Sequence, residues 1–346
     1  MTTYPVRVGI IGCGVVAHEY ARTLAPDPDV HVTACTDLDP ARARDFGLRH
    51  NISPVPPENI LDPAHVDLIA VLTPPDTHAT LIRDAITAGL PAIWTEKPLA
   101  MRPGDAEALI IQAAEAGILL GAAPDTPMGS AAQTALRALE KGAIGEPLSA
   151  SAALHNRGPE RWHPNPQAFH TDGIGPLGDM GPYYLATLTH LLGHVTRVHG
   201  ATTQLRNPRV DSTGAAFTAR AATHVTALLG IGDIPITFTA SFDTGPTRAP
   251  HLEIHGSDGV LVLPDPNFHD GAVLLRGPQE PAWTTLPAEP PVRAHSGRGM
   301  GVADLAHALS HGTTPFCDAA RAAHVAHIIE SIHTFASPGR VPGSSR

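Results

Sequence analysis

The first regular pattern in the chain is the stretch Val6-Arg7-Val8-Gly9-Ile10-Ile11-Gly12-Cys13-Gly14-Val15-Val16-Ala17. Its first half is a short apolar run typical of a buried strand, and a helical pattern follows as far as Leu24. The spacing G-x-G-x-x-A joins them, in which Gly12 permits a tight turn and Gly14 lets the backbone approach a pyrophosphate. Because the N–H groups of a helix start favour phosphate, this context predicts a dinucleotide site. Its candidate residues are Gly12, Cys13, Gly14, Val15 and Val16.

A second predicted strand, Val30 to Thr36, ends at Asp37. A carboxylate at this place can accept both hydrogen bonds from an adenosine ribose and repels a 2′-phosphate. We therefore expect NAD as the cofactor. Arg42 and Arg44 on the following helix leave NADP as the alternative, and a strand-to-helix turn with an incidental Asp is the other interpretation.

Strands and helices continue to alternate through residue 123, with further strands expected at Val66–Leu72, Pro91–Trp94 and Ile118–Ala122. This rhythm predicts an α/β fold, with a doubly wound parallel sheet in a Rossmann domain over residues 1–123. Ligands bind at the carboxyl ends of the strands of such a sheet. Besides the glycine loop and Asp37, the crevice there should collect Thr73, Pro74, His78, Glu96 and Lys97.

Lys97 is one of only two lysines in the chain, against 21 arginines. An Arg does not deprotonate in a protein, whereas the pKa of a Lys shifts readily when the amine is desolvated. Lys97 follows an apolar strand-like run directly, within Thr95-Glu96-Lys97-Pro98-Leu99, whereas Lys141 has the setting of an ordinary helix C-terminus. Lys97 is therefore the first candidate for proton transfer.

Composition narrows the class of protein further. A chain of 346 residues suggests two domains, and a net charge of −10 argues against nucleic acid and anionic membranes as partners. We expect no membrane span, no signal peptide and no disulfide framework from three widely spaced cysteines, which together fit the cytoplasm. The histidines lack ligand spacing with Cys or carboxylates, so no metal site is expected.

From about Pro124 the pattern changes, and a second domain is expected over residues 124–346. Its β-rich runs are separated by turn residues at hairpin spacing. A glycine-rich loop, His170 to Gly178, is expected to deliver Asp179 to the start of a helix that runs to Leu192. Asp179, Tyr183 and His190 would then share one helical face.

Four pieces of the chain resemble, in order and spacing, the glucose–fructose oxidoreductase / inositol dehydrogenase / rhizopine-catabolism (Gfo/Idh/MocA) family. They are Gly12–Ala17, Thr73–His78, Glu96–Leu99 and Asp179–Pro182. The resemblance implies an NAD(P)-binding Rossmann domain and a C-terminal α/β domain with an open, mostly antiparallel sheet, for substrate binding and oligomerisation. It also implies nicotinamide chemistry on sugars, cyclitols or related polyols, with Lys97 beside the reacting carbon and a cis Lys97–Pro98 bond. A homodimer or tetramer is expected on the same ground.

The chain departs from the family pattern at Tyr183. Relatives carry a His four residues after the Asp as the proton-transfer group, so that role cannot be carried over. A phenol with an ordinary pKa near 10 exchanges protons at neutral pH only beside a cation, and Lys97 is one candidate cation. We hypothesise a proton relay of Tyr183 and Lys97, with Asp179 orienting substrate hydroxyls or Lys97; a packing role for Tyr183 is the alternative.

Four further candidates have two interpretations each. The stretch Arg161–Pro166 resembles a loop that covers the nicotinamide in relatives, which makes Trp162 a cofactor contact and His163 and His170 substrate contacts. A surface loop with one anchoring Trp is the alternative. Asp125, after the last strand of the first domain, would bind a substrate hydroxyl or amine, or cap the next helix.

The resulting hypothesis is an NAD-dependent dehydrogenase or ketoreductase that acts on a secondary alcohol or ketone of a sugar, amino sugar or cyclitol. The abundance of Pro, Gly and Ala indicates a coding sequence of high GC content. Such a source suggests that the protein tailors natural-product sugars, of aminoglycoside type, for antibiotic biosynthesis. The alternatives are a redox-neutral NAD-dependent glycosidase, a catabolic inositol or polyol dehydrogenase, and a non-catalytic NAD-binding regulator.

Overall fold

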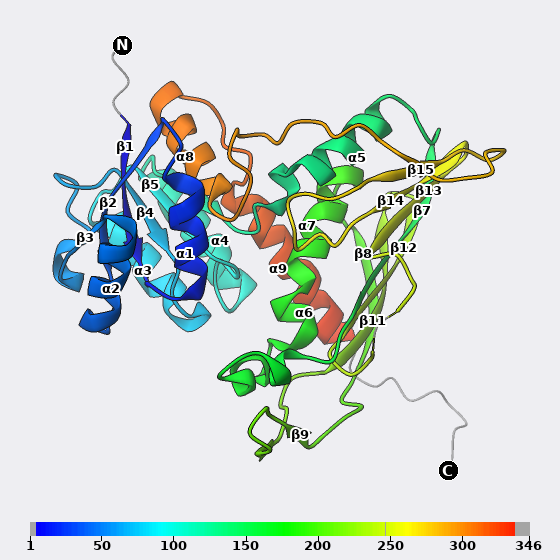
Figure 1. The fold of residues 1–346 in the computed structure, drawn as a ribbon, viewed down its shortest axis with the longest axis horizontal. Helices are drawn as coiled ribbons and strands as arrows, with labels where there is room; N and C mark the ends of the chain where they lie inside the picture. Colours follow the sequence, from blue (N-terminus) through cyan, green and yellow to red (C-terminus); the bar gives the residue numbers. More distant parts are fainter. Residues whose placement is uncertain (1–4, 246, 336–346) are drawn as a thin grey trace. The chain divides into compact units, whose positions relative to one another are not determined.

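The computed structural model describes residues 5–245 and 247–335, and its contacts divide the chain into two compact units (Figure 1). The first unit contains the residues up to Gln133 together with Phe268–Asp270 and Glu289–Ala326. The second contains Thr134–Asn267, Gly271–Ala288 and the residues from His327. The chain therefore passes between the units more than once.

Six parallel strands form the sheet of the first unit, in the order β3-β2-β1-β4-β5-β6. They are β1 (Val6–Ile11), β2 (Val30–Thr36), β3 (Ser53–Pro54), β4 (Leu68–Val71), β5 (Ala92–Thr95) and β6 (Leu119–Ala122). The predicted doubly wound parallel sheet is confirmed. Strand order reverses between β1 and β4, which is where open sheets of this kind bind their ligands.

Helices cover both faces of this sheet, and the central strands β4 and β5 are accordingly buried on both sides. One apolar cluster contains side chains of α1 (Val15–Leu24), α2 (Pro40–His50) and α8 (Met300–His311). The other contains side chains of α3 (Pro75–Thr87), α4 (Pro103–Glu115) and the first part of α9 (Ala319–Phe335). Short 3₁₀ turns, η1 (Pro57–Asn59) and η2 (Thr126–Met128), complete the unit.

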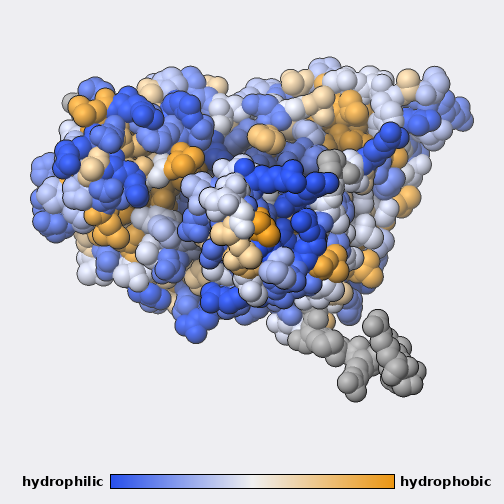
Figure 2. Space-filling view, turned by 60° about the horizontal axis from the view of Figure 1, so that its bottom comes forward, coloured by the Kyte–Doolittle hydropathy of each residue, from blue (hydrophilic) through white to orange (hydrophobic). Residues whose placement is uncertain are grey.

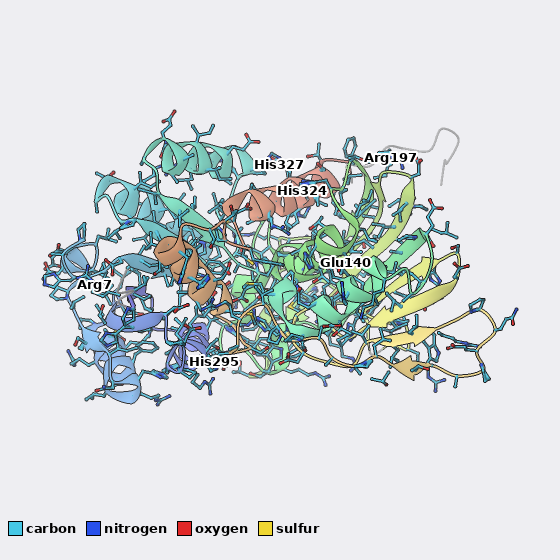
Figure 3. All side chains as sticks on the ribbon, turned by 90° about the horizontal axis from the view of Figure 1, so that it is seen from above. Arg7, Glu140, Arg197, His295, His324 and His327 are labelled. Atoms are coloured by element: carbon cyan, nitrogen blue, oxygen red, sulfur yellow. The ribbon has the colours of Figure 1, made fainter. Side chains whose placement is uncertain are left out.

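An ion pair ties the entry of β1 to the segment before β4. Arg7, labelled in Figure 3, donates from Nε to Asp67 Oδ2 at 2.9 Å and from a terminal nitrogen to Asp67 Oδ1 at 2.7 Å. These hydrogen bonds hold the pKa of Asp67 below its ordinary value. The two strands that flank the switch point are thereby joined by side chains as well as by backbone.

Eight strands form the sheet of the second unit, in the order β16-β15-β14-β13-β7-β12-β11-β8. The strands are β7 (Pro147–His155), β8 (Arg197–Thr203), β11 (His224–Ile231), β12 (Ile234–Ser241), β13 (Leu252–Gly256), β14 (Gly259–Leu263), β15 (Leu274–Arg276) and β16 (Thr284–Thr285). Only β7 and β12 pair in parallel, so the expectation of a mostly antiparallel sheet is confirmed. A separate ribbon pairs β9 (Arg209–Val210) with β10 (Ala216–Phe217).

The helical elements around this sheet are α5 (Ser130–Glu140), η3 (Pro159–Arg161), η4 (Pro166–His170), α6 (Gly175–Asp179) and α7 (Gly181–Leu192). The expectation that Asp179 begins a long helix is wrong, because Asp179 is the last residue of α6 and α7 starts at Gly181. Pro182 explains the break: it has no N–H for the carbonyl of Gly178, and its ring would collide with that carbonyl. Asp179 and Tyr183 therefore do not share one helix.

Polar residues dominate the face seen in Figure 2, where apolar residues form small, scattered patches. Within residues 5–245 and 247–335, none of the helices combines the length and apolarity that crossing a bilayer requires. The three cysteines, Cys13, Cys35 and Cys317, are free and buried.

Candidate active site

Four neighbouring strands of the first unit end beside one another. Because β2, β1, β4 and β5 are adjacent and parallel, the residues that follow them lie along one edge of the sheet. These residues are Gly12 after β1, Asp37 after β2, Thr73 after β4, and Glu96 and Lys97 after β5. The structure thus brings the glycine loop, an acidic residue and a lysine to the same edge.

The glycine loop has the shape that a pyrophosphate requires. Gly12 has a φ of +94°, and a Cβ there would lie 2.7 Å from the carbonyl oxygen of Leu72, so only Gly fits. Around Gly14 an added Cβ would meet nothing within 4 Å, which leaves open space above the start of α1. Gly14 caps α1 without a side-chain hydrogen bond, so the free N–H groups of the first turn suit an anionic ligand.

Asp37 is held in place by the loop that precedes α1 and by its own turn. Its Oδ2 accepts the N–H of Cys13 at 2.9 Å, and its Oδ1 accepts the N–H of Asp39 at 2.9 Å. One guanidinium nitrogen of Arg42 lies 3.4 Å from Oδ1, on a side chain that is 56% exposed. Beside these polar groups Leu38 and Val15 are 93% and 85% exposed, which gives the edge apolar surface for a ligand to cover.

His78 joins the segment after β4 to the segment after β5. Its Nδ1 lies 2.7 Å from the carbonyl oxygen of Pro98, and its Nε2 lies 2.8 Å from that of Thr73. The ring is fully buried, and the Lys97–Pro98 bond is cis, as the family resemblance implied. His78 therefore fixes the backbone beside Lys97, a different role from the cofactor contact expected of it; Pro74 caps α3 nearby.

A buried chain of hydrogen bonds leads to Lys97. Trp94 donates from Nε1 to the hydroxyl of Tyr20 at 3.1 Å, and Tyr20 donates to Glu96 Oε1 at 2.8 Å. The other carboxylate oxygen, Glu96 Oε2, accepts the backbone N–H of Lys97 at 3.1 Å. Burial first, and then the charge of Glu96, raise the pKa of Tyr20 well above its ordinary value, so the phenol remains a donor. Tyr20 and Trp94 thereby orient Glu96.

Sequence reasoning missed Tyr20 and Trp94. Trp94 appeared only as the apolar end of a strand, and Tyr20 only as part of a helix. One pattern points to Tyr20: it shares the buried face of α1 with Ala17, Ala21 and Leu24, where a hydroxyl needs a partner. Its partner, however, lies 76 positions away in the sequence.

Asp125 lies in a structural position. It is 1% exposed, and its Oδ1 lies 3.1 Å from Nε2 of His269. Its Oδ2 accepts the N–H groups of Gly299 at 2.8 Å and Gly301 at 3.1 Å, at the start of α8. Burial acts to raise its pKa, but His269 and the two N–H groups outweigh burial and lower it. Oδ2 thus caps the start of α8 and Oδ1 pairs with His269, so neither oxygen is left open to a substrate.

Tyr183 and Asp179 lie on successive helices of the second unit. Tyr183 is 5% exposed within α7, and Asp179 is half-buried at the end of α6. His190 belongs to the last turn of α7. Tyr183 and His190 therefore lie on one helix, while the bend at Met180 separates Asp179 from both.

The loop that was expected to cover the nicotinamide forms an aromatic cluster. Trp162 is 71% exposed, and the ring centroids of His163 and Phe169 lie 5.3 and 6.2 Å from that of Trp162. His170 is 2% exposed instead, with Nε2 3.0 Å from Glu160 Oε1. Trp162 is thus open to a ligand, whereas His170 is part of a buried ion-pair cluster. In the described part of the chain no group of His, Cys, Asp or Glu side chains is arranged to hold a metal ion.

Two family descriptions match the chain. Residues 6–123 match "Oxidoreductase family, NAD-binding Rossmann fold", and residues 132–262 match "GFO/IDH/MocA C-terminal domain". Together they cover the glycine loop, Asp37, Lys97, Asp179 and Tyr183.

Curated relatives and solved structures show the same similarity. The chain is 30% identical to dTDP-3,4-didehydro-2,6-dideoxy-alpha-D-glucose 3-reductase of Streptomyces violaceoruber, over 76% of this chain and 73% of that protein. It is 24% identical to D-apiose dehydrogenase of Paraburkholderia graminis, over 81% of this chain and 75% of that protein. A levoglucosan dehydrogenase in complex with NADH and levoglucosan has a TM-score of 0.79 at 19% identity, over 96% and 97% of the two chains. At that identity the structural similarity shows the fold.

Proposed function

Because this chain belongs to the Gfo/Idh/MocA family of NAD(P)-dependent oxidoreductases, we propose that it moves a hydride between a nicotinamide and a secondary alcohol or ketone of a sugar, amino sugar or cyclitol. One observation carries the proposal: Lys97 and the open glycine loop lie at the same edge of one parallel sheet. That edge combines a group that can exchange a proton with a site shaped for a dinucleotide.

The residues at the edge fit a dinucleotide. The free N–H groups at the start of α1 and the open space over Gly14 would hold the pyrophosphate. Asp37 would accept the hydroxyls of the adenosine ribose, which favours NAD over NADP, and Arg42 is the residue that would accommodate a 2′-phosphate. The bound nicotinamide supplies the hydride donor or acceptor.

The chain's own residues handle the proton and orient the substrate. Lys97 holds or accepts the proton of the reacting hydroxyl at Nζ, since a lysine amine can deprotonate. Tyr183 shares this proton transfer through its hydroxyl, and Asp179 accepts hydrogen bonds from neighbouring substrate hydroxyls. Trp162 contributes an exposed aromatic surface, and His163 lies beside it.

The names of the relatives reported above give a carbohydrate as the substrate of each. One of them is a reductase of a dTDP-linked deoxysugar, and this supports a place for the chain in the tailoring of natural-product sugars. The net charge of −10 favours an amino sugar over an acidic sugar.

The test is nicotinamide absorbance with purified protein, NAD and NADP separately, across neutral sugars, inositols and aminoglycosides. We expect NADH to appear with one substrate class and to vanish in Lys97→Ala, while NADH binding persists. Tight NAD binding without reduction by any substrate would contradict the dehydrogenase. It would point instead to a redox-neutral glycosidase, detected by product release with catalytic NAD, or to a regulator.

A further inference from the structure

A pocket of about 420 Å³ in the second unit has an unusual wall of arginines. Four of its nine lining residues are Arg, in a chain whose net charge is −10. These are Arg157, Arg161, Arg206 and Arg209, from the segment around η3 and the segment that leads into β9. The volume is in the range of small-molecule sites, which run from roughly 300 to 1,000 Å³.

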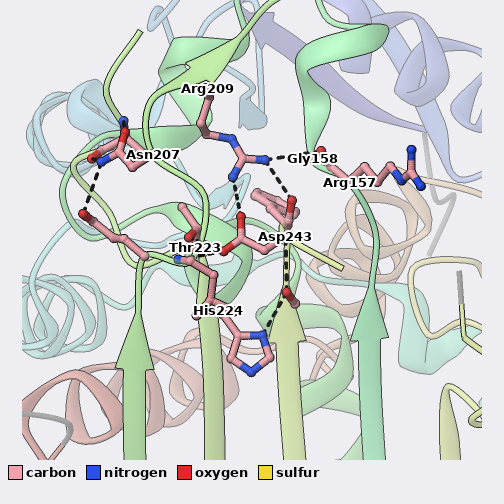
Figure 4. A network of polar contacts seen from close by, with 12 residues as sticks. Arg157, Gly158, Asn207, Arg209, Thr223, His224 and Asp243 are labelled. Carbon is pink, nitrogen blue, oxygen red and sulfur yellow. Dashed lines mark hydrogen bonds and ion pairs between the residues drawn. The ribbon is translucent and has the colours of Figure 1, made fainter. Parts of the chain in front are cut away.

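The floor of the pocket is a buried, hydrogen-bonded cluster around Arg209, which is 4% exposed (Figure 4). Arg209 donates to Glu160 and, at 2.5 Å, to Asp243 Oδ1, and also to the carbonyl oxygen of Phe242 at 2.8 Å. Thr223 donates to the second oxygen of Asp243 at 2.5 Å. Because these groups are fixed by one another, the floor is rigid. Three of the four carboxylate oxygens of Glu160 and Asp243 have donors, while Glu160 Oε2 is buried without one among the described residues.

The remaining acid of the wall is also engaged. Asp211 Oδ1 accepts the N–H of Thr213 at 2.8 Å, the hydroxyl of Thr213 at 2.6 Å and the N–H of Ala215 at 3.0 Å. Hydrogen bonds within this turn lower the pKa of Asp211. Asp211 therefore holds the loop between β9 and β10, and among the described residues it pairs with none of the arginines of the pocket.

Two exposed arginines of the pocket have hydrogen-bond donors that no acceptor of the described residues uses. Arg161 and Arg206 are exposed, and their guanidinium groups have no hydrogen-bond or ion-pair partner among residues 5–245 and 247–335. Arg157 also lines the pocket, but its side chain extends away from Arg209 in Figure 4, so the two guanidinium groups considered for a ligand are those of Arg161 and Arg206. Planar guanidinium groups match the oxygens of phosphate in paired hydrogen bonds.

We infer that this pocket binds a phosphate or diphosphate group of a small molecule, through Arg161 and Arg206 over the rigid floor of Arg209. A diphosphate suits it better than a carboxylate, because several negatively charged oxygens can meet two guanidinium groups at once. Exposed apolar side chains at the same place, Val210 in the wall and Trp162 next to Arg161, offer surface for the uncharged part of such a ligand. The group belongs either to a free anion or to a nucleoside diphosphate sugar.

The inference rests on the second unit alone, so binding can be measured without catalysis. Calorimetry would titrate inorganic pyrophosphate into the protein at constant ionic strength, with NAD present in excess to fill the glycine loop. The test variant is the double substitution Arg161→Gln/Arg206→Gln. Arg220→Gln is the matched control, since Arg220 is an exposed arginine of the same unit that lies 3.5 Å from Asp172 and does not line the pocket.

Pyrophosphate should bind the natural protein and Arg220→Gln alike, and at least about tenfold more weakly to the double variant, as two lost phosphate contacts require. NADH should still bind the double variant, which shows that it is folded. No binding to the natural protein, or equal binding to the double variant, overturns the inference. A second titration, with UDP-glucose, identifies the source of the phosphate group. If UDP-glucose binds more tightly than pyrophosphate and this binding is lost in the double variant, the ligand is a nucleotide-linked sugar. If the two bind equally well, the ligand is a free anion. Because no hydride transfer is measured, a failed nicotinamide assay leaves these outcomes unaffected.

Discussion

The hydroxyl of Tyr20 donates to Glu96 Oε1 at 2.8 Å, inside the first unit and away from solvent. The opposite oxygen of Glu96 accepts the backbone N–H of Lys97. Tyr20, a residue of α1, thus orients the carboxylate that holds the backbone of Lys97. Trp94 completes the arrangement by donating to the same phenol.

Replacing Tyr20 by Phe should change the titration of Lys97. Without the phenol, the negative charge of Glu96 is no longer shared with a donor, so the ammonium of Lys97 should lose its proton at a higher pH than in the natural protein. The chain has only two lysines, so reductive methylation with ¹³C and NMR titration would follow Lys97 directly. Lys141 serves as an internal reference, and Lys97→Arg assigns the signals.

If Tyr20 has a purely structural role, the substitution should change the stability of the protein and not the titration of Lys97. The variant would then lose about 1–3 kcal/mol of stability, from a buried carboxylate oxygen without its donor, with both lysine titrations unchanged. Trp94→Phe is the control, because it removes the indole N–H and leaves the bond from Tyr20 to Glu96. An unchanged Lys97 signal in Tyr20→Phe would end the positioning hypothesis.

Tyr183→Phe tests the proposed proton relay. Loss of the hydroxyl should lower kcat by about a hundredfold, the usual range for removal of a general acid or base, with KM little changed. The control is Tyr184→Phe, the neighbouring buried phenol, which contacts Nδ1 of His251 at 2.7 Å and Oδ1 of Asp265 at 3.1 Å. That variant should lose stability and keep kcat. Full activity in Tyr183→Phe would leave the proton to Lys97 or His190.

The parts of the fold that could be predicted are those that depend on residues close to one another along the chain. The turn at Gly12, the end of β2 at Asp37 and the strand before Lys97 each follow from neighbouring residues. Asp179 was placed wrongly even though the cause, Pro182, is three residues away. A proline interrupts the hydrogen bonds that precede it in a helix, and this local rule places the break before Pro182.

Other features depend on residues that only the fold brings together. His269 lies 144 positions from Asp125, and Arg209 lies 49 positions from Glu160. No periodicity or motif links such pairs, because burial of a charge and its partner is decided by tertiary packing. For this reason Asp125 and His170 looked like open site residues in the sequence, while in the structure each belongs to a buried pair of a carboxylate and an imidazole.

Asp37→Ser should shift the preference of the protein from NADH towards NADPH. The change removes the carboxylate that would hold the ribose hydroxyls and repel a 2′-phosphate, and it leaves Arg42 available for the phosphate. We expect about a tenfold loss in NADH affinity and a gain of similar size for NADPH, measured by fluorescence titration. Asp39→Ser is the matched control, since Asp39 caps α2 and Ser also caps helices. Equal losses for both cofactors would contradict a role in selection.

The pair of Glu160 and Arg209 should make the stability of the second unit depend on pH. Burial acts to raise the pKa of Glu160, but hydrogen bonds from His170 and Arg209 outweigh burial and lower the pKa to about 2. Because the folded-state pKa lies below the ordinary value of 4.5, the stabilisation is complete above that value and is lost as the pH falls towards 2. At neutral pH, Glu160→Gln should therefore cost about 2–3 kcal/mol in urea unfolding, since it leaves Arg209 buried with a weaker partner.

The cost of Glu160→Gln should stay constant from neutral pH down to about pH 5 and then shrink as the pH falls to about 3, because below the ordinary pKa of 4.5 the natural carboxyl takes up its proton on unfolding. Glu140→Gln is the matched control. Glu140 is 53% exposed in its pair with Arg137, and such surface pairs contribute at most about 1 kcal/mol. A difference between the natural protein and Glu160→Gln that stays constant over this range would mean that the pKa of Glu160 is not lowered in the folded protein. The buried residues around Arg209, on the floor of the pocket, would then be held in place by packing rather than by charge.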